Sequence, residues 1–247
     1  LAARGVTNAT SVIDKEVASV AEAVADIFDG ATVMIGGFGE AGSPIELIHA
    51  LIDLGATDLT VVNNNTGNGE VGLAALLKAG QVSKMICSHP RSTNSTVFPD
   101  LYRSGRTALE LVPQGTLAER IRAGGAGIPA FYTPTAVGTP LEEGMERRSF
   151  DGRDYLLARG LSADFALIKG RSSDRHGNVV YNKTARNFSP LMAMAAKTTI
   201  VQASSVVPVG EIDPEVVVTP GIFVSRVVAV ADPAHESVLV ADGVSYP

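Results

Sequence analysis

The sequence contains no tryptophan, one cysteine and few aromatic residues, which make up 5% of the chain. Because Cys87 is alone, no disulfide can form within the chain; a disulfide-stapled secreted fold is excluded and a cytoplasmic location is expected. No apolar run approaches the roughly 20 residues needed to span a bilayer, so we expect no membrane association. Basic clusters are also missing, and the net charge of -6 argues against binding to nucleic acid. Small molecules are the expected partners.

The composition is that of an ordinary globular protein. Its 247 residues are 45% hydrophobic, which predicts one substantial core rather than two equal domains. Helical and strand periodicities alternate, which predicts an α/β fold with a mostly parallel sheet flanked by helices. One domain should span residues 1–247, with 1–10 disordered or foreign to the native chain and 128–160 forming a small irregular flap. The predicted strands are residues 32–35, 59–62, 82–87, 109–112, 165–169, 199–203 and 222–230.

Helix starts are indicated by capping patterns. Ser43 followed by Glu46 has the spacing of a capping box before the predicted helix 45–54. Thr116 and Glu119 repeat that spacing, which predicts a helix opening near Leu117 and ending at the glycine pair 124–125. Further helices are predicted at residues 17–28, 73–79 and 191–196, with a hairpin around 176–178.

Four glycines lie between the predicted strand 32–35 and the helix that follows it: Gly36, Gly37, Gly39 and Gly42. Glycine permits positive φ and close approach of a ligand, and the N–H groups at a helix start favour an anion or a developing oxyanion. The spacing is neither that of a Walker A loop nor G-x-G-x-x-G, which disfavours a classical nucleotide-binding fold. Taken alone, these glycines are equally compatible with a tight turn.

Other polar residues are ambiguous by themselves. The asparagines at 63–65 follow a predicted strand, where they fit either a turn or a binding site at the strand end. Gln114 alone carries little information. The four histidines show no metal-ligand spacing, and no G-x-S-x-G elbow is present. We therefore predict no metal site and no permanently bound cofactor.

Residues 29–44 read Asp-Gly-Ala-Thr-Val-Met-Ile-Gly-Gly-Phe-Gly-Glu-Ala-Gly-Ser-Pro. This stretch resembles the first signature of family I coenzyme A transferases and agrees with it at every specified position. The resemblance extends over residues 14–230, and the chain is identified as a member of this family. Stretches that resemble the family's α subunits are 64–65, 113–125, 129–132, 177–178 and 185–188.

The resemblance implies a reaction and a set of site residues. Enzymes of this family move coenzyme A between two carboxylic acids through a glutamate, which forms an acyl anhydride and then a glutamyl thioester. By resemblance, Asn64 and Asn65 lie beside the acyl group and its oxyanion, and Gln114 holds a substrate carboxylate. The implied coenzyme A loop consists of Gly36, Gly37, Phe38, Gly39, Glu40, Ala41 and Gly42.

The family's nucleophilic glutamate lies in a Ser-Glu-Asn-Gly motif, and none of the 13 glutamates of this chain has that context. The resemblance therefore implies that this chain carries no catalytic residue. It implies instead a β subunit, separate or fused, that brings the glutamate into an αβ or α2β2 complex. The remaining partners would be small molecules, namely an acyl-CoA thioester as substrate and a carboxylic acid.

The substrate expectation rests on two further stretches, 186–198 and 219–224. They most resemble family members that act on 3-oxoadipate with succinyl-CoA as the donor. The type that acts on acetoacetate is the alternative substrate assignment. A non-enzymatic effector-binding domain is the alternative from a different class.

Overall fold

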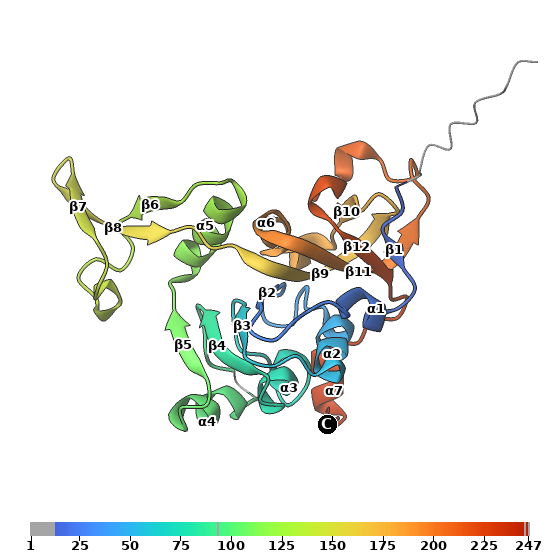
Figure 1. Cartoon of the computed structure of the whole chain (residues 1–247), viewed down its shortest axis with the longest axis horizontal. Coiled ribbons are helices and arrows are strands. Elements are labelled where there is room, and N and C mark those ends of the chain that lie inside the picture. Colours follow the sequence, from blue (N-terminus) through green and yellow to red (C-terminus); the bar gives the residue numbers. More distant parts are fainter. Residues whose placement is uncertain (1–12, 93, 245, 247) are drawn as a thin grey trace, which may run out of the picture.

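The protein consists of a nine-stranded sheet with helices on both faces and a three-stranded sheet that projects from one end (Figure 1). A computed structural model describes residues 13–92, 94–244 and 246, so the prediction for residues 1–10 lies outside the described residues. The strands are β1 (Glu16–Val17), β2 (Thr32–Ile35), β3 (Leu59–Val62), β4 (Val82–Cys87), β5 (Ala108–Leu111), β6 (Ala130–Thr133), β7 (Arg147–Phe150), β8 (Arg153–Arg159), β9 (Ala163–Asp174), β10 (Val179–Val180), β11 (Ala196–Val207) and β12 (Arg226–Ala229).

The helices are mostly short. No helix within the described residues is long and apolar enough to cross a membrane. Short 3-10 turns lie at Pro140–Glu142, Lys183–Arg186, Pro214–Val216 and Gly221–Phe223. The α-helices are α1 (Val20–Val24), α2 (Ile45–Leu54), α3 (Gly72–Lys78), α4 (Val97–Arg103), α5 (Gln114–Gly125), α6 (Ser189–Ala195) and α7 (Glu236–Ala241).

The strand order of the main sheet is β1-β12-β11-β9-β2-β3-β4-β5, and these neighbours pair in parallel. β10 pairs antiparallel with β9 and closes the predicted hairpin. This topology confirms the predicted α/β class with a mostly parallel sheet. It also brings the carboxyl ends of β2, β3, β4 and β5 to one edge of the sheet.

Both faces of the sheet are buried, which explains why its strands are continuously apolar in sequence. On β2, Val33 and Ile35 face one core, which is covered by α1, α2, α3 and α4. Met34 faces the other core, which is covered by α5 and α6. Figure 1 shows these two layers on opposite sides of the sheet.

Two predicted elements are shorter than the sequence indicated. The first helix covers only Val20–Val24: Glu16 and Val17 pair with Val227 and Val228 as an edge strand, and the helix ends at Val24 instead of residue 28. Likewise, the predicted strand 222–230 begins only at Arg226, after the 3-10 turn at Gly221–Phe223. In both cases the apolar pattern of the sequence continues beyond the end of the regular element.

The first predicted capping box does not form. The N-cap of α2 is Pro44, which makes no side-chain capping bond. The hydroxyl of Ser43 instead donates to the Glu236 carboxylate (3.1 Å), and the Glu46 carboxylate accepts the N–H of Ala234 (2.5 Å). Both capping side chains are therefore used by the C-terminal segment, which the local pattern could not indicate.

The second capping box is also wrong. Helix α5 begins at Gln114, before the predicted start at Leu117, and Thr116 lies inside the helix with its buried hydroxyl lacking a hydrogen-bond partner among the described residues. Glu119 accepts two hydrogen bonds from Arg122, one turn further on. Pro113 sets the earlier start, because its fixed φ is compatible with the residue before a helix.

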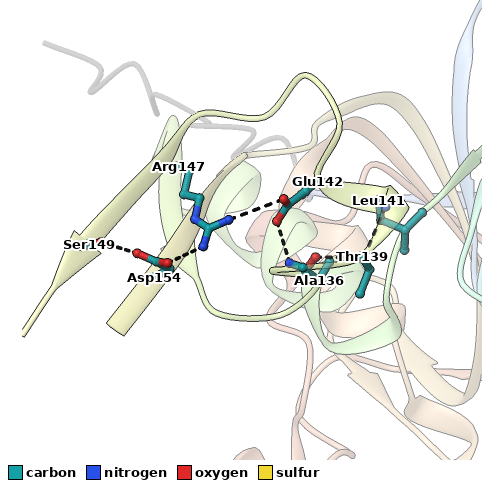
Figure 2. Close-up of polar contacts among 8 residues, drawn as sticks. Ala136, Thr139, Leu141, Glu142, Arg147, Ser149 and Asp154 are labelled. Atoms are coloured by element: carbon teal, nitrogen blue, oxygen red, sulfur yellow. Dashed lines mark hydrogen bonds and ion pairs between the residues drawn. The ribbon is translucent and has the colours of Figure 1, made fainter. Parts of the chain in front are cut away.

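Residues 130–159, within the segment predicted as an irregular flap, contain the regular sheet β6-β8-β7, which we call the arm. The arm projects away from the main sheet (Figure 1). Its far end is held by polar contacts in which Arg147 reaches both Glu142 (3.5 Å) and Asp154, and Asp154 also accepts from Ser149 (Figure 2). These pairs are exposed, so each stabilises the arm only weakly.

Candidate functional site

An open cavity of about 940 Å³ lies at the edge where four parallel strands end. Loops after β2, β3 and β4 and the first residue of α5 after β5 form its wall. Ligand sites of open α/β sheets lie at this edge, because the loops that leave the strand ends converge there. The lining residues are Phe38, Gly39, Asn64, Asn65, Asn68, Ser88, His89, Arg91, Ser92 and Gln114.

The glycine loop after β2 uses several of its N–H groups internally. Gly36 donates to the carbonyl of Leu167 (2.8 Å), and Gly37 donates to the side-chain oxygen of Asn187 (3.2 Å). The N–H of Phe38 closes the loop on Ala41 (3.0 Å). The N–H groups of Gly39 and Glu40 donate to no other group of the described residues. The tip of the loop therefore has backbone donors that it can offer to a ligand.

Asn187 fastens this loop from a distant part of the chain. Its amide nitrogen donates to the carbonyl of Ala41 (2.7 Å), so one side chain bonds both sides of the loop. Asn187 itself has φ 24°, a backbone conformation that few residues adopt. A Cβ added to Gly42 would lie 2.2 Å from the carbonyl oxygen of Ala185. Glycine is required at position 42 because the segment 183–187 packs directly against it.

The three asparagines after β3 have different environments. Asn63 is buried, donates to the carbonyl of Ile35 (2.7 Å) and accepts the N–H of Asn65 (2.8 Å), which ties this loop to the end of β2. The side-chain oxygens of Asn64 and Asn65 accept from Ser88 (2.7 Å) and from the N–H of Gly67 (2.9 Å). The amide NH₂ groups of Asn64 and Asn65 are left as donors beside the cavity.

Gln114 lies at the first position of α5 and lines the same cavity. The unpaired N–H groups and the dipole of a helix start favour a negative charge there, and the side-chain amide adds two donors. The structure thus brings Gln114, Asn64 and Asn65 together with Phe38 and Gly39, although these residues are up to 76 positions apart in the sequence (114 − 38 = 76). This set of neutral donors suits a carboxylate or a carbonyl oxygen that gains negative charge.

The rest of the predicted loop points elsewhere. Glu40, Ala41 and Gly42 line a second cavity of about 640 Å³, together with Lys169 and Arg171. Gly36 and Gly37 line neither of these two cavities. The glycine loop therefore forms the wall between the two cavities.

The cavity is also lined by residues that the sequence analysis did not select: Asn68 on the loop after β3, and Ser88, His89, Arg91 and Ser92 on the loop after β4. His89 donates its N–H to the carbonyl of Asn64 (2.9 Å), and the hydroxyl of Ser92 donates to Asn68 (2.7 Å). These bonds join the loop after β4 to the loop after β3. The sequence could have indicated these residues, because residues 82–87 were predicted as a strand and the loops that follow strands of an α/β sheet form its ligand sites.

The C-terminal helix α7 holds two of the site loops. Its first residue, Glu236, is only 2% exposed and accepts from Ser43 (3.1 Å) and from the amide of Asn68 (3.0 Å). Burial raises the pKa of Glu236 to about 7; the two hydrogen bonds and Lys169 oppose this rise, and Glu40 adds to it. A buried carboxyl thus connects the glycine loop to the loop after β3.

Glu236 should make the stability of the protein depend on pH. Because its pKa is higher in the folded chain than in the unfolded one, folding favours the protonated form, and stability is lost as the pH rises from about 4.5 to about 7. Glu236→Gln keeps the shape but does not titrate. Between pH 5 and 8, the wild-type unfolding free energy should fall by roughly 2–3 kcal/mol more than that of the variant.

Urea unfolding at a series of pH values measures this difference. The control is Glu211→Gln, which removes an exposed carboxylate and should leave the wild-type profile unchanged. Parallel profiles for wild type and Glu236→Gln would show that Glu236 has no raised pKa in the folded protein.

Nucleophilic thiol and metal chemistry receive no support from the described residues. Burial raises the pKa of Cys87 to about 12, so its thiol stays protonated at neutral pH. Among the residues that the structure describes, no group of three histidine, cysteine, aspartate or glutamate side chains is placed to hold a metal ion.

The chain is similar to known sequences over most of its length. The family model described as coenzyme A transferase matches residues 17–230. The chain is 59% identical over 227 residues to one subunit of the 3-oxoadipate CoA-transferase of Pseudomonas putida, covering 92% of this chain and 98% of the relative. It is 50% identical over 214 residues to one subunit of a probable succinyl-CoA:3-ketoacid coenzyme A transferase of Bacillus subtilis, covering 87% of this chain and 89% of the relative.

Solved structures support the fold. The acyl-CoA transferase YdiF of Escherichia coli O157:H7 superposes with a TM-score of 0.80 at 24% identity, covering 90% of this chain. The match takes in 48% of the YdiF chain, so this chain spans about half the length of that protein. At this identity the likeness shows a shared fold.

Proposed function

The chain belongs to the coenzyme A transferase family, and from this premise we propose that it is the α subunit of an enzyme that transfers coenzyme A from succinyl-CoA to 3-oxoadipate. The observation that carries the substrate assignment is the 59% identity to one subunit of a 3-oxoadipate CoA-transferase over 98% of that relative. The cavity at the strand ends is compatible with this function, because it presents amide donors suited to carboxylates and thioester carbonyls.

Each predicted site residue has a proposed role in this reaction. The amides of Asn64 and Asn65 stabilise the carbonyl oxygen of the acyl group as it becomes negative. Gln114 binds the carboxylate that receives coenzyme A. The loop 36–42 lies along the thioester at its tip, with the free N–H group of Gly39 as its donor on the side of this cavity. Asn187 and the N–H groups of Gly36 and Gly37 keep that loop in shape.

The nucleophile is proposed to come from a partner protein, the β subunit. No aspartate or glutamate is among the described residues that line the cavity, and Glu40 lines the neighbouring one. In the proposed reaction, a glutamate of the partner attacks the thioester carbonyl, the C–S bond breaks and the thiolate leaves. The thiolate then attacks the glutamyl carbonyl of the anhydride and displaces succinate. The acceptor carboxylate reverses these two steps and takes coenzyme A.

The covalent step can be tested on the complex of this chain with its partner. After incubation with succinyl-CoA and no acceptor, intact-mass measurement should show one coenzyme A bound covalently to the partner and none on this chain. Addition of 3-oxoadipate should remove the label. A label on this chain would contradict the assignment of the nucleophile, and no label on either chain would favour the effector-binding alternative.

Acceptor competition tests the substrate. The Bacillus subtilis relative is named for a 3-ketoacid, which makes acetoacetate the second candidate acceptor. With succinyl-CoA as donor, 3-oxoadipate should give the higher kcat/KM, and a clear preference for acetoacetate would transfer the assignment to that second candidate.

A further inference from the structure

The large cavity has a neutral lining with one exception. Its lining contains no aspartate or glutamate among the described residues, and Arg91 is its single lysine or arginine. The other polar lining residues are asparagines, serines, Gln114 and His89. Because arginine stays protonated in proteins, Arg91 brings a permanent positive charge to the cavity.

Arg91 lies on a loop whose position is set by hydrogen bonds on both sides of it. Before it, Ser88 and His89 bond to Asn64, and after it Ser92 bonds to Asn68. The guanidinium of Arg91 itself has no hydrogen bond or ion pair with any described residue. Its backbone is therefore held at the cavity wall while its side chain keeps all of its donors for a ligand.

The neighbouring surface does not neutralise this charge. Arg91 also lines an adjacent cavity of about 410 Å³, where the other charged residue is Arg103. Arg103 is paired with Asp100 (3.0 Å). An exposed arginine is often only a solvated surface group. Arg91 differs from Arg103 because it is unpaired and shares a cavity with the amides of Asn64, Asn65 and Gln114.

The proposed substrates supply a negative charge that these amides leave unmatched. 3-Oxoadipate has one carboxylate that receives coenzyme A and a second, distal carboxylate that stays ionised throughout the reaction. Succinyl-CoA likewise retains one free carboxylate. Acetoacetate has only the reacting carboxylate. A carboxylate taken out of water without a cationic partner is strongly destabilised, and arginine is the side chain best shaped to bind it with two hydrogen bonds.

We propose that Arg91 binds the distal carboxylate of the acyl group and is the residue that selects dicarboxylic over monocarboxylic acceptors. This inference rests on the proposed transfer of coenzyme A to a 3-oxo acid in this cavity. The amides position the reacting end of the acceptor, and Arg91 fixes the other end across the cavity. The distal carboxylate makes no covalent bond at any step.

The test uses the complex of the full chain with its partner and compares acceptors. In a ping-pong reaction, kcat/KM for an acceptor reports only its reaction with the glutamyl thioester, so effects of Arg91 on the donor cancel. Arg91→Gln should lower the ratio of kcat/KM for 3-oxoadipate to that for acetoacetate by about 10–100-fold, the loss expected for a hydrogen bond to a charged group. Arg91→Lys, which keeps the charge, should restore part of the ratio. Arg103→Gln is the matched control and should leave the ratio at its wild-type value.

The outcomes separate this inference from the function on which it rests. If the wild-type complex uses neither acceptor, the proposed function fails. If the wild-type complex uses 3-oxoadipate and Arg91→Gln lowers kcat/KM equally for both acceptors, Arg91 is a structural residue and the inference is overturned. An unchanged ratio would overturn it too, because Arg91 would then be a solvated surface group.

Discussion

The Gly42→Ala variant should have a Tm roughly 5–15 °C below that of wild type. Gly42 has φ 81°, where an L residue is strained by about 1–2 kcal/mol, and its new Cβ would meet the carbonyl oxygen of Ala185 at 2.2 Å. Because the clash is with backbone, the segment 183–187 must move, which costs about 1–3 kcal/mol more. Together these terms lower the unfolding free energy by about 2–5 kcal/mol, and each kcal/mol lowers Tm by about 2–4 °C in a chain of this size.

The matched control for this clash is Gly55→Ala. Gly55 ends α2 with φ 80°, and nothing lies within 4 Å of the Cβ position. Because only the backbone strain is added, the unfolding free energy of that variant should fall by about 1–2 kcal/mol. Calorimetry of the three proteins measures the difference, and equal losses for the two variants would show that the contact between Gly42 and Ala185 has no energetic weight. Gly42→Ala should also reduce activity, because Asn187 would move with Ala185.

Gln114→Ala in the assembled complex should lower kcat/KM for the carboxylate acceptor by about 10–100-fold. The lost interaction is a hydrogen bond to a charged group, which contributes about 1.5–3 kcal/mol. Gln114→Glu should lower kcat/KM further, because it places a second negative charge beside the substrate carboxylate. Thermal unfolding should change little in either variant, since Gln114 is exposed at the start of α5.

A control on the same helix is Glu119→Gln, which removes the pair with Arg122 outside the cavity. Its kcat/KM should stay within about twofold of wild type, because an exposed ion pair of this kind contributes at most about 1 kcal/mol to stability. Steady-state kinetics with varied acceptor give both values. An unaltered kcat/KM for Gln114→Ala would show that Gln114 does not bind the acceptor.

The strands were predictable because their signal is local. Residues 32–35, 59–62 and 82–87 are apolar runs of strand length between glycine, asparagine and aspartate turns, and all three form strands with these bounds. The two capping boxes failed for the opposite reason. Ser43 and Glu46 have the capping spacing, but their polar atoms bond to residues 188–193 positions away, and no local pattern reveals such partners.

The same difference applies to the candidate site. Asn64, Asn65 and Gln114 were selected from stretches that resemble a family, and the structure places all three on one cavity. Their roles stay predictions. Arg91 and Glu236 were not selected, because an arginine in a polar loop and a glutamate near the C-terminus are unremarkable in sequence. Only the burial of Glu236 and the position of Arg91 beside the amides distinguish them.

The sequence alone determined that the chain is an α/β protein with a glycine loop of the coenzyme A transferase type, because apolar periodicity and a continuous signature are properties of neighbouring residues. Tertiary structure decided which loop N–H groups are free and that Asn187 fastens the loop. It also decided that Arg91 lies on the wall of a cavity lined mainly by uncharged amides and hydroxyls. These features depend on which distant side chains satisfy each polar group, and hydrogen bonding between strand-end loops settles that only in the folded chain.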